Sequence, residues 1–294
     1  MEKVSIILPT FNRAHLLGET IKSVQLQTYP YWELIIVDDG STDRTPQLIE
    51  RLADSRIRYF AQPHSGNIIS LRLNGIYYAN GEFIAFLDSD DLWIPEKLKT
   101  QLDLLHENPD ASFVFSNGLH FGEDDSPPKN CISFFKGNIF LPMLIDEQFI
   151  YFVPSLLIRR KVMNKVTGLM PHPIENDLDF LLRLGCVCDG IFINKRLVKI
   201  RKHQDSDSNN HDILPQIEYI SMVRRFKDMN MLSEMEFKKV TSRELYKLGV
   251  KFTHDKQWVK AEQYFNQALN ESPYSLRILG RVIQVRLNKF IELR

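Results

Sequence analysis

Short apolar runs alternate with amphipathic stretches along the first part of the chain. Four of these runs are nearly continuous and rich in β-branched residues, which is typical of strands buried on both faces of a sheet. They span residues 3–8, 32–37, 57–60 and 83–87. The segments between them place apolar residues at the three- and four-residue spacing of helices. Strands that alternate with helices predict right-handed crossovers and a parallel sheet.

The middle of the chain has a less regular pattern. Residues 112–115 form another short apolar run, and a polar, proline-containing loop follows at residues 122–130. Beyond it we expect a strand leading into a helix at residues 153–160, an amphipathic helix at 178–184 and a late edge strand at 191–200. The aromatic residues of this region fit either the core or an acceptor cleft, and the core is the simpler interpretation.

The pattern changes again near residue 240. Residues 213–239 predict one or two linking helices. The positions that follow match the spacing of one tetratricopeptide repeat (TPR): Leu245, Leu248, Gly249, Phe252, Ala261, Phe265, Ala268 and Pro273. A single repeat must pack against a neighbouring structure to be stable, because solenoids need about three repeats. Residues 277–294 predict a basic amphipathic helix, which suits either a solvated cap or attraction to anionic lipid.

Polar and acidic residues follow three of the predicted strands directly. They lie at residues 9–13, 38–43 and 88–91. Ligands bind at the carboxyl ends of strands in parallel sheets, so we expect these loops to meet at one edge. Carboxylates as close as Asp88, Asp90 and Asp91 repel one another unless they share a cation. A divalent-metal site that carries a phosphorylated ligand is therefore favoured over a simple helix N-cap.

Composition and charge narrow the class of protein. The 294 residues are 44% hydrophobic and 25% charged, which is enough for a globular core. The formal net charge of +0 provides no overall field that would attract nucleic acid. The first apolar run is too short to span a membrane, and the pattern shows no secretory signal. The cysteine count of 3 is odd, which favours a reduced, intracellular protein.

The three loops and their strands resemble the family 2 glycosyltransferases. The motifs that carry the resemblance occur in the family's order: SIILPTFNR at residues 5–13, ELIIVDDGSTD at 33–43 and GEFIAFLDSDD at 81–91. The resemblance implies an α/β protein with the A-type glycosyltransferase (GT-A) fold, a Rossmann-like and mostly parallel sheet flanked by helices. It also implies a nucleotide-diphosphate sugar as donor.

Several residues match donor-binding positions of that family. By this resemblance Pro9 and Phe11 line the nucleotide base, and Asp39 contacts the base or the ribose. An aromatic face and a carboxylate suit these roles, although both also occur in cores and turns. Arg72 matches an arginine that meets phosphate, although Leu73 stands where an asparagine is common. The motifs also include Arg13, Asp38 and Ser89 in the donor site.

Asp88 and Asp90 match the family's Asp-x-Asp motif. The resemblance implies that they bind Mn²⁺ or Mg²⁺, both of which prefer oxygen ligands. A histidine after the last strand often completes such a site, and His203 is the candidate, with His211 second. Asp91 is expected to cap the next helix. The polar loop after His203 is a candidate lid over the donor.

Asp177 matches the family's catalytic base, which takes the proton of the acceptor hydroxyl. In the family an acidic pair precedes an amphipathic helix that ends in Arg-Leu. Here Asn176 replaces the usual glutamate, and Glu175 is the alternative base. A carboxylate at this place would also cap the helix.

The resemblance implies an inverting, metal-dependent glycosyltransferase. The expected donor is a UDP-sugar, and the acceptor is a glycan, a lipid-linked glycan or a protein. The family-level expectation is a cytoplasmic enzyme of bacterial surface polysaccharide or glycoconjugate synthesis, at the inner face of the membrane. The alternatives are a nucleotidyltransferase and a non-catalytic nucleotide-binding scaffold. The glycine-free loop at residues 9–13 disfavours the first, and the presence of the metal carboxylates and the base disfavours the second.

The pattern divides the chain into a catalytic domain and a helical region. We expect the catalytic domain at residues 1–212, with a nucleotide-sugar-binding half at 1–115 and an acceptor half at 116–212. Residues 213–239 would link it to the helical region at 240–294. For that region, the sequence leaves open a peripheral membrane contact or a protein partner.

Overall fold

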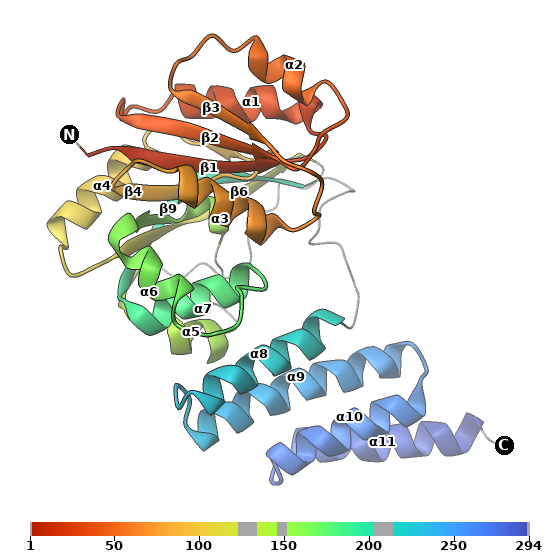
Figure 1. The fold of residues 1–294 in the computed structure, drawn as a ribbon. Helices are drawn as coiled ribbons and strands as arrows, with labels where there is room; N and C mark the ends of the chain where they lie inside the picture. Colours follow the sequence, from red (N-terminus) through yellow and green to blue (C-terminus); the bar gives the residue numbers. More distant parts are fainter. Residues whose placement is uncertain (1, 123–133, 146–151, 203–213, 293–294) are drawn as a thin grey trace. The chain divides into compact units, whose positions relative to one another are not determined.

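The computed structural model describes residues 2–122, 134–145, 152–202 and 214–292. The chain forms two compact units, Met1–Ser206 and Asp207–Arg294. The first unit holds a mixed sheet with helices on both faces, and the described part of the second consists of helices and their connections (Figure 1). Because the sheet and its helices alternate along the chain, the α/β fold class expected from the sequence is confirmed.

The sheet of the first unit has nine strands in the described residues. They are Val4–Thr10 (β1), Trp32–Asp38 (β2), Ile57–Ala61 (β3), Phe83–Phe86 (β4), Leu92–Trp93 (β5), Phe113–Gly122 (β6), Phe134–Gly137 (β7), Leu157–Arg159 (β8) and Gly190–Lys202 (β9). Their order in the sheet is β3-β2-β1-β4-β8-β6-β9-β5, and β7 pairs with β9.

The first four strands are parallel, as the alternating pattern predicts. β1 pairs with β2 over its whole length, from Val4 beside Trp32 to Thr10 beside Asp38. β4 pairs in parallel with the other side of β1, and β3 with β2. The carboxyl ends of β1, β2 and β4 therefore lie at one edge of the sheet.

The other half of the sheet is mixed. β8 lies antiparallel between β4 and β6, while β9 is parallel to β6 and antiparallel to β5 and β7. The sequence does not indicate these reversals of strand direction. β8 has 3 residues and β5 has 2, and strands this short show no alternating pattern that could be recognised. The helix that follows β5 begins only at Lys97, since Trp93 pairs with β9.

Helices cover both faces of the sheet. α1 (Ala14–Gln25) and α4 (Lys97–Glu107) share a core with Val4, Ile6 and Leu8 of β1. α3 (Ile68–Tyr78) packs on the other face, where Gly75 lies directly against Ile7. The first unit also contains α2 (Thr45–Glu50), α5 (Phe140–Ile145), α6 (Met163–Thr167) and α7 (Asp177–Val187).

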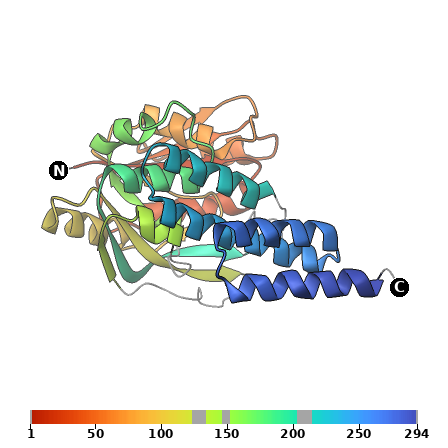
Figure 2. The same cartoon turned by 90° about the horizontal axis from the view of Figure 1, so that it is seen from below.

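The second unit contains α8 (Leu214–Asp228), α9 (Glu234–His254), α10 (Trp258–Glu271) and α11 (Leu276–Glu292). Consecutive helices lie side by side in both views (Figures 1 and 2). Ser233 and Glu236 form a complete capping box that starts α9. The core consists of Phe252, Ala261, Phe265, Ala268, Ile278, Val282 and Val285. Within the part of the chain described here, no helix combines the length and apolarity that crossing a membrane requires.

Gly249 lets α9 approach α10 closely. A Cβ at this position would lie 2.6 Å from the ring of Phe265, which is fully buried, whereas Gly280 of α11 has open space around its Cβ position. We expect Gly249→Ala to lower the free energy of unfolding by about 1–2 kcal/mol, because the ring must shift. Gly280→Ala should raise it by about 0.5–1 kcal/mol, because alanine restricts the unfolded chain.

Urea unfolding followed by circular dichroism measures both glycine variants under the same conditions. The two substitutions add the same methyl group to helices of the same unit, so the sign of the change reports local packing. A Gly249→Ala variant as stable as Gly280→Ala would contradict the close approach of α9 and α10.

Candidate functional site

Three loops meet at the carboxyl edge of β1, β2 and β4. The register pairs Thr10 with Asp38, so the loops after β1 and β2 begin side by side. β4 reaches the same edge, where the N–H of Leu87 donates to the carbonyl of Ile7 (3.0 Å). The shared edge therefore carries residues 9–13, 38–43 and 88–91, as the sequence predicts.

Asn12 links the first loop to the second. Its backbone has φ 52°, a left-handed conformation that asparagine tolerates better than most residues. Its side-chain oxygen accepts hydrogen bonds from the N–H groups of Thr42 (2.8 Å) and Asp43 (3.2 Å). The N–H of Asn12 donates to Ser41 Oγ (2.8 Å), and the N–H of Ala14 donates to Asp43 (3.0 Å). Three hydrogen bonds of Asn12 and one of Ala14 thus hold the two loops together.

Asp39 holds a third loop at this edge. Its buried carboxylate accepts hydrogen bonds from the N–H and Oγ of Ser65 (both 2.9 Å) and from the N–H of Gly66 (2.8 Å). Burial alone would raise the pKa of Asp39, but these hydrogen bonds hold the pKa below its usual range. His64 Nδ1 lies 2.8 Å from the same carboxylate. Asp39 therefore stays ionised and organises the loop that precedes α3.

Phe11 and His64 form an aromatic pair beside this loop. Their ring centroids are 4.2 Å apart and the rings are inclined by only 20°. Phe11 is 39% exposed, although the strand that precedes it is buried. Pro9, two residues earlier, is buried. The sequence did not single out His64, because its contact with Phe11 spans two separate crossovers of the sheet.

The carboxylate of Asp38 faces its own loop. It accepts hydrogen bonds from the N–H (2.9 Å) and Oγ (2.6 Å) of Ser41 and from the hydroxyl of Tyr59 (2.5 Å). Burial and this hydrogen bond raise the pKa of Tyr59, so the hydroxyl remains a donor. Asp38 is 1% exposed. These three hydrogen bonds stabilise the loop. A bound ligand could reach the carboxylate of Asp38 only if some of these hydrogen bonds broke.

Arg72 joins two carboxylates that lie far apart in the sequence. The side chain projects from α3, and 6% of the residue is exposed. Its Nη2 donates to Asp88 Oδ1 (2.6 Å), and its Nη1 donates to Asp177 Oδ1. Burial alone would lower the pKa of Arg72, but the two carboxylates raise it, so the guanidinium keeps its charge. The buried Nε–H makes no hydrogen bond to the described residues.

Asn176 and Asp177 have different roles at the start of α7. Asn176 is the N-cap, and its side chain accepts a hydrogen bond from the N–H of Asp179 (3.0 Å). Asp177 is the first helical residue, and its carboxylate contacts Arg72. The alternative role for a carboxylate here, that of a helix cap, is therefore filled by the asparagine instead. Glu175, the alternative base, is exposed.

A fully buried ion pair supports the start of α7. Arg183 donates to Asp179 from Nε (3.0 Å) and Nη2 (2.9 Å), and neither side chain is exposed (0%). Arg183 also donates to the carbonyls of His172 and Pro173 (both 3.0 Å). Asp179 in turn accepts a hydrogen bond from the N–H of Glu175 (3.1 Å). The pair thus ties the preceding loop to the helix and restrains the residues at the helix start.

Arg201 of β9 organises the turn after β4. Its N–H donates to the buried carboxylate of Asp91 and its Nε to the carbonyl of Asp90 (both 2.9 Å). Its Nη2 also donates to Glu19 of α1 (2.5 Å). Asp91 was expected to cap α4, but that helix begins at Lys97 without a side-chain cap, so the expectation is wrong. The sequence could not reveal the true partner, which lies 110 residues away.

Three carboxylates lie close together in the turn after β4, those of Asp88, Asp90 and Asp91. Burial raises the pKa of both Asp88 and Asp91, and repulsion from Asp90 adds to each shift. A divalent cation at Asp88 and Asp90 would relieve this repulsion, and carboxylate oxygens are the ligands that Mg²⁺ and Mn²⁺ prefer. No group of three or more His, Cys, Asp or Glu side chains in the described residues could hold a metal ion. The two aspartates fit a cation that takes its other ligands from a bound diphosphate and water.

The other predicted residues have varied surroundings. Arg13 precedes α1, and its guanidinium has no hydrogen-bond or ion-pair partner among the described residues. Ser89 lies in the turn after β4, and its carbonyl accepts a hydrogen bond from Thr20 Oγ1 (3.0 Å). His203, His211 and the candidate lid lie outside the described residues.

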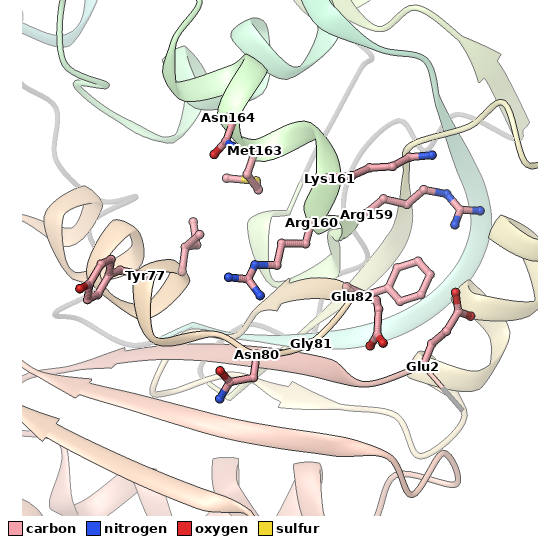
Figure 3. A pocket seen from close by; sticks show the side chains of 12 residues that line it. Glu2, Tyr77, Asn80, Gly81, Glu82, Arg159, Arg160, Lys161, Met163 and Asn164 are labelled. Carbon is pink, nitrogen blue, oxygen red and sulfur yellow. The ribbon is translucent and has the colours of Figure 1, made fainter.

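An open hollow of about 820 Å³ lies at the opposite edge of the sheet (Figure 3). Gly81 and Glu82, which precede β4, line it together with Tyr77, Arg160 and Asn164. Its lining includes none of the site residues predicted from the sequence. The hollow is therefore separate from the carboxylates that follow β4.

Residues 5–167 match the family model described as glycosyl transferase family 2. This span begins in β1 and ends in α6, so it contains the three loops, Arg72 and the turn after β4. It is more than half of the chain. The start of α7, with Asp177, lies beyond the match.

Curated relatives align with part of the chain. Escherichia coli WfgD, a UDP-Glc:alpha-D-GlcNAc-diphosphoundecaprenol beta-1,3-glucosyltransferase, is 41% identical over 114 residues, which are 39% of this chain and 45% of that protein. A Campylobacter jejuni GalNAc(5)-diNAcBac-PP-undecaprenol beta-1,3-glucosyltransferase is 40% identical over 126 residues, which are 40% of this chain and 39% of that protein. The matched region thus spans less than half the length of either relative.

Among solved structures, S. aureus TarS has a similar fold. The crystal structure of its residues 1–349 in complex with UDP-GlcNAc superposes with a TM-score of 0.69, covering 98% of this chain and 88% of that one. The two sequences are 18% identical. At that identity the similarity establishes the GT-A-like fold but does not identify the substrates of this chain.

Proposed function

The chain belongs to glycosyl transferase family 2, and we propose that it transfers a sugar from a nucleotide-diphosphate donor to an acceptor hydroxyl with inversion at the anomeric carbon. The observation that carries this proposal is the contact of Arg72 with both Asp88 and Asp177. It joins the candidate metal ligand, the candidate phosphate-binding arginine and the candidate base in one cluster. The loop proposed to bind the nucleotide base lies at the same edge of the sheet.

The proposed donor is a UDP-sugar. The exposed ring of Phe11 can stack on a pyrimidine. The carboxylate of Asp39 could accept hydrogen bonds from the base or ribose once its contacts with Ser65 and Gly66 open. Arg13 and Arg72 supply cations for the diphosphate. WfgD is named for UDP-Glc and the TarS structure contains UDP-GlcNAc, which supports uridine as the nucleoside.

Asp177 is the proposed general base. Its carboxylate accepts the proton of the acceptor hydroxyl while that oxygen attacks the anomeric carbon. The new bond forms on the face opposite the diphosphate, and the bond from the anomeric carbon to the diphosphate oxygen breaks, so the configuration inverts. The nucleoside diphosphate leaves with the electron pair. Arg72 stabilises the charge on the leaving group by hydrogen bonding, which requires it to release at least one carboxylate.

Asp88 and Asp90 are proposed to hold Mn²⁺ or Mg²⁺, with Ser89 between them in the donor site and His203 as a further ligand. A cation there would supply electrophilic stabilisation to the departing diphosphate. The raised pKa of Asp88, caused first by burial and then by neighbouring carboxylates, supports a site that needs positive charge.

Manganese should therefore strengthen UDP binding. We expect the wild-type protein to bind UDP at least about tenfold more tightly with manganese than with a chelator, because a cation held by Asp88 and Asp90 would offset the charge of the diphosphate. Asp90→Asn should bring the two affinities together, whereas Asp110→Asn, at an exposed position outside the site, should preserve the difference. Isothermal titration calorimetry measures all three proteins. Equal wild-type affinity under both conditions would exclude a metal that assists binding.

The proposed acceptor is a lipid-linked glycan of bacterial surface polysaccharide synthesis, which would place the enzyme at the cytoplasmic face of the membrane. The names of the E. coli and C. jejuni relatives both specify undecaprenol-linked substrates, which supports this choice. A free glycan or a protein is the alternative acceptor. A panel of nucleotide sugars, offered with short-chain diphosphate-linked sugars and manganese, tests donor and acceptor together. Absence of transfer or hydrolysis with every donor would overturn the proposed function.

The helical region is proposed to contain one TPR-like helix pair. Small residues at Gly249, Ala261 and Ala268 support it, because they let α9 and α10 approach closely. A boundary near residue 212 between catalytic and helical regions belongs to the same proposal, and the compact units divide nearby, after Ser206.

A further inference from the structure

α11 carries two apolar faces, and the second unit uses only one of them. Ile278, Val282 and Val285 are buried in the core that includes α10. A helix at the surface of a globular unit normally has a single apolar face, with polar residues opposite. A second apolar face on such a helix therefore requires its own explanation.

The second face is exposed to solvent. It includes five large apolar side chains, each 42–82% exposed: Leu276, Leu279, Ile283, Leu287 and Ile291. We call these residues the exposed α11 face. Their spacing of three and four residues places them along one side of the helix. A contiguous apolar surface of this kind marks a binding surface, whereas single exposed apolar residues do not.

Cationic side chains border the exposed α11 face. On one side Arg277 and Arg281 donate to the hydroxyl of Tyr246 (3.1 and 3.4 Å), and neither has a carboxylate partner among the described residues. On the other side Arg286 pairs with Glu262 (2.7 Å). Arg277 and Arg281 thus leave an excess of positive charge beside the apolar stripe.

We propose that the exposed α11 face binds the surface of an anionic lipid membrane, with the helix in the plane of the interface. An apolar stripe bordered by arginines is the pattern of interfacial helices, whose apolar side chains enter the acyl boundary while the cations meet lipid phosphates. A second copy of the chain is a poorer occupant, because two such faces would bring like-charged arginines together. This inference rests on the proposed function for its purpose, since a lipid-linked acceptor is met at a membrane, but the binding itself requires no catalysis.

Co-sedimentation with lipid vesicles tests the proposal on the full chain. Mixed phosphatidylcholine and phosphatidylglycerol vesicles should pellet the wild-type protein, and phosphatidylcholine vesicles should pellet much less. The double variant Leu279→Glu with Ile283→Glu should lose binding, because both side chains lie on the exposed α11 face. The matched control, Ile217→Glu with Met235→Glu, changes exposed apolar residues of α8 and α9 and should keep binding.

A second pair of variants tests the charge. Arg277→Gln with Arg281→Gln should weaken binding to the mixed vesicles about 25-fold, because each cation near an anionic surface contributes roughly a fivefold factor. Lys238→Gln with Lys239→Gln, which removes two cations from α9, is the matched control and should have little effect. If the glutamate variant proves unfolded by circular dichroism, the arginine variant decides the question.

Three outcomes overturn the proposal. The first is a wild-type protein that does not sediment with mixed vesicles, and the second is a folded glutamate variant that sediments equally well. The third is a dimer, detected by light scattering, that the glutamate variant dissociates while vesicles bind neither protein. UDP binding measured in the same samples separates the two proposals. A chain that binds UDP but no vesicles refutes only the membrane inference.

Discussion

Replacement of Asp177 by asparagine is expected to lower kcat for sugar transfer about a thousandfold. The amide cannot accept the proton of the acceptor hydroxyl, but its oxygen can still accept the hydrogen bond from Arg72. The geometry of the cluster should therefore survive, and UDP affinity should change by less than about threefold. Steady-state kinetics and calorimetric titration of UDP separate the two effects.

Glu175→Gln is the matched control for that experiment. Glu175 is exposed, precedes the helix and is the other carboxylate that could act as base. Its variant should retain most of the wild-type kcat. The opposite result, an inactive Glu175→Gln beside an active Asp177→Asn, would transfer the role of base to Glu175.

Breaking the buried pair beneath the same helix should have the largest effect on stability. We expect Asp179→Asn to lower the free energy of unfolding by about 3–5 kcal/mol, because it leaves the guanidinium of Arg183 buried without a countercharge. Urea unfolding measures the loss. In the remaining folded protein, kcat should fall while UDP affinity is kept, since the pair restrains the start of α7 and not the nucleotide loops.

Lys99 and Asp103 offer a control with the same spacing along a helix in an exposed environment. They are also four residues apart on a helix and 2.8 Å from each other, but their side chains are 60% and 53% exposed. Asp103→Asn should lower the free energy of unfolding by no more than about 0.5 kcal/mol, because exposed pairs of this kind are screened. Similar losses for both variants would show that burial does not control the strength of the Asp179 pair.

The parallel half of the sheet could be predicted because its determinants are local. Apolar runs of strand length, each followed by a polar loop and a helix, are sufficient to specify β1 to β4 and the edge where their loops meet. The mixed half could not be predicted in the same way. β8 has 3 residues and joins β4 to β6 only through long-range pairing. The sequence therefore contains no periodic pattern from which β8 could be predicted.

The same distinction applies to the site. The motifs identified Asp88 and Asp177 separately, but only the fold shows that Arg72 connects them. Arg72 and Asp177 are 105 residues apart in the sequence. Charge types alone do not reveal such pairs, because many arginines and carboxylates could match. For the N-cap of α7 the sequence analysis considered only a carboxylate, whereas the structure places Asn176 at that position.

Because of the hydrogen bonds around Asn12, the nucleoside and the diphosphate of a sugar donor would contribute unequally to its binding affinity. Because the loops after β1 and β2 are already ordered, a nucleoside meets a surface whose conformational entropy was lost during folding and is not lost again on binding. The diphosphate, in contrast, must compete with Asp88 and Asp177 for Arg72. The nucleoside end would then supply most of the net affinity, while the exchange of ion pairs at Arg72 would determine which phosphorylated forms are accepted.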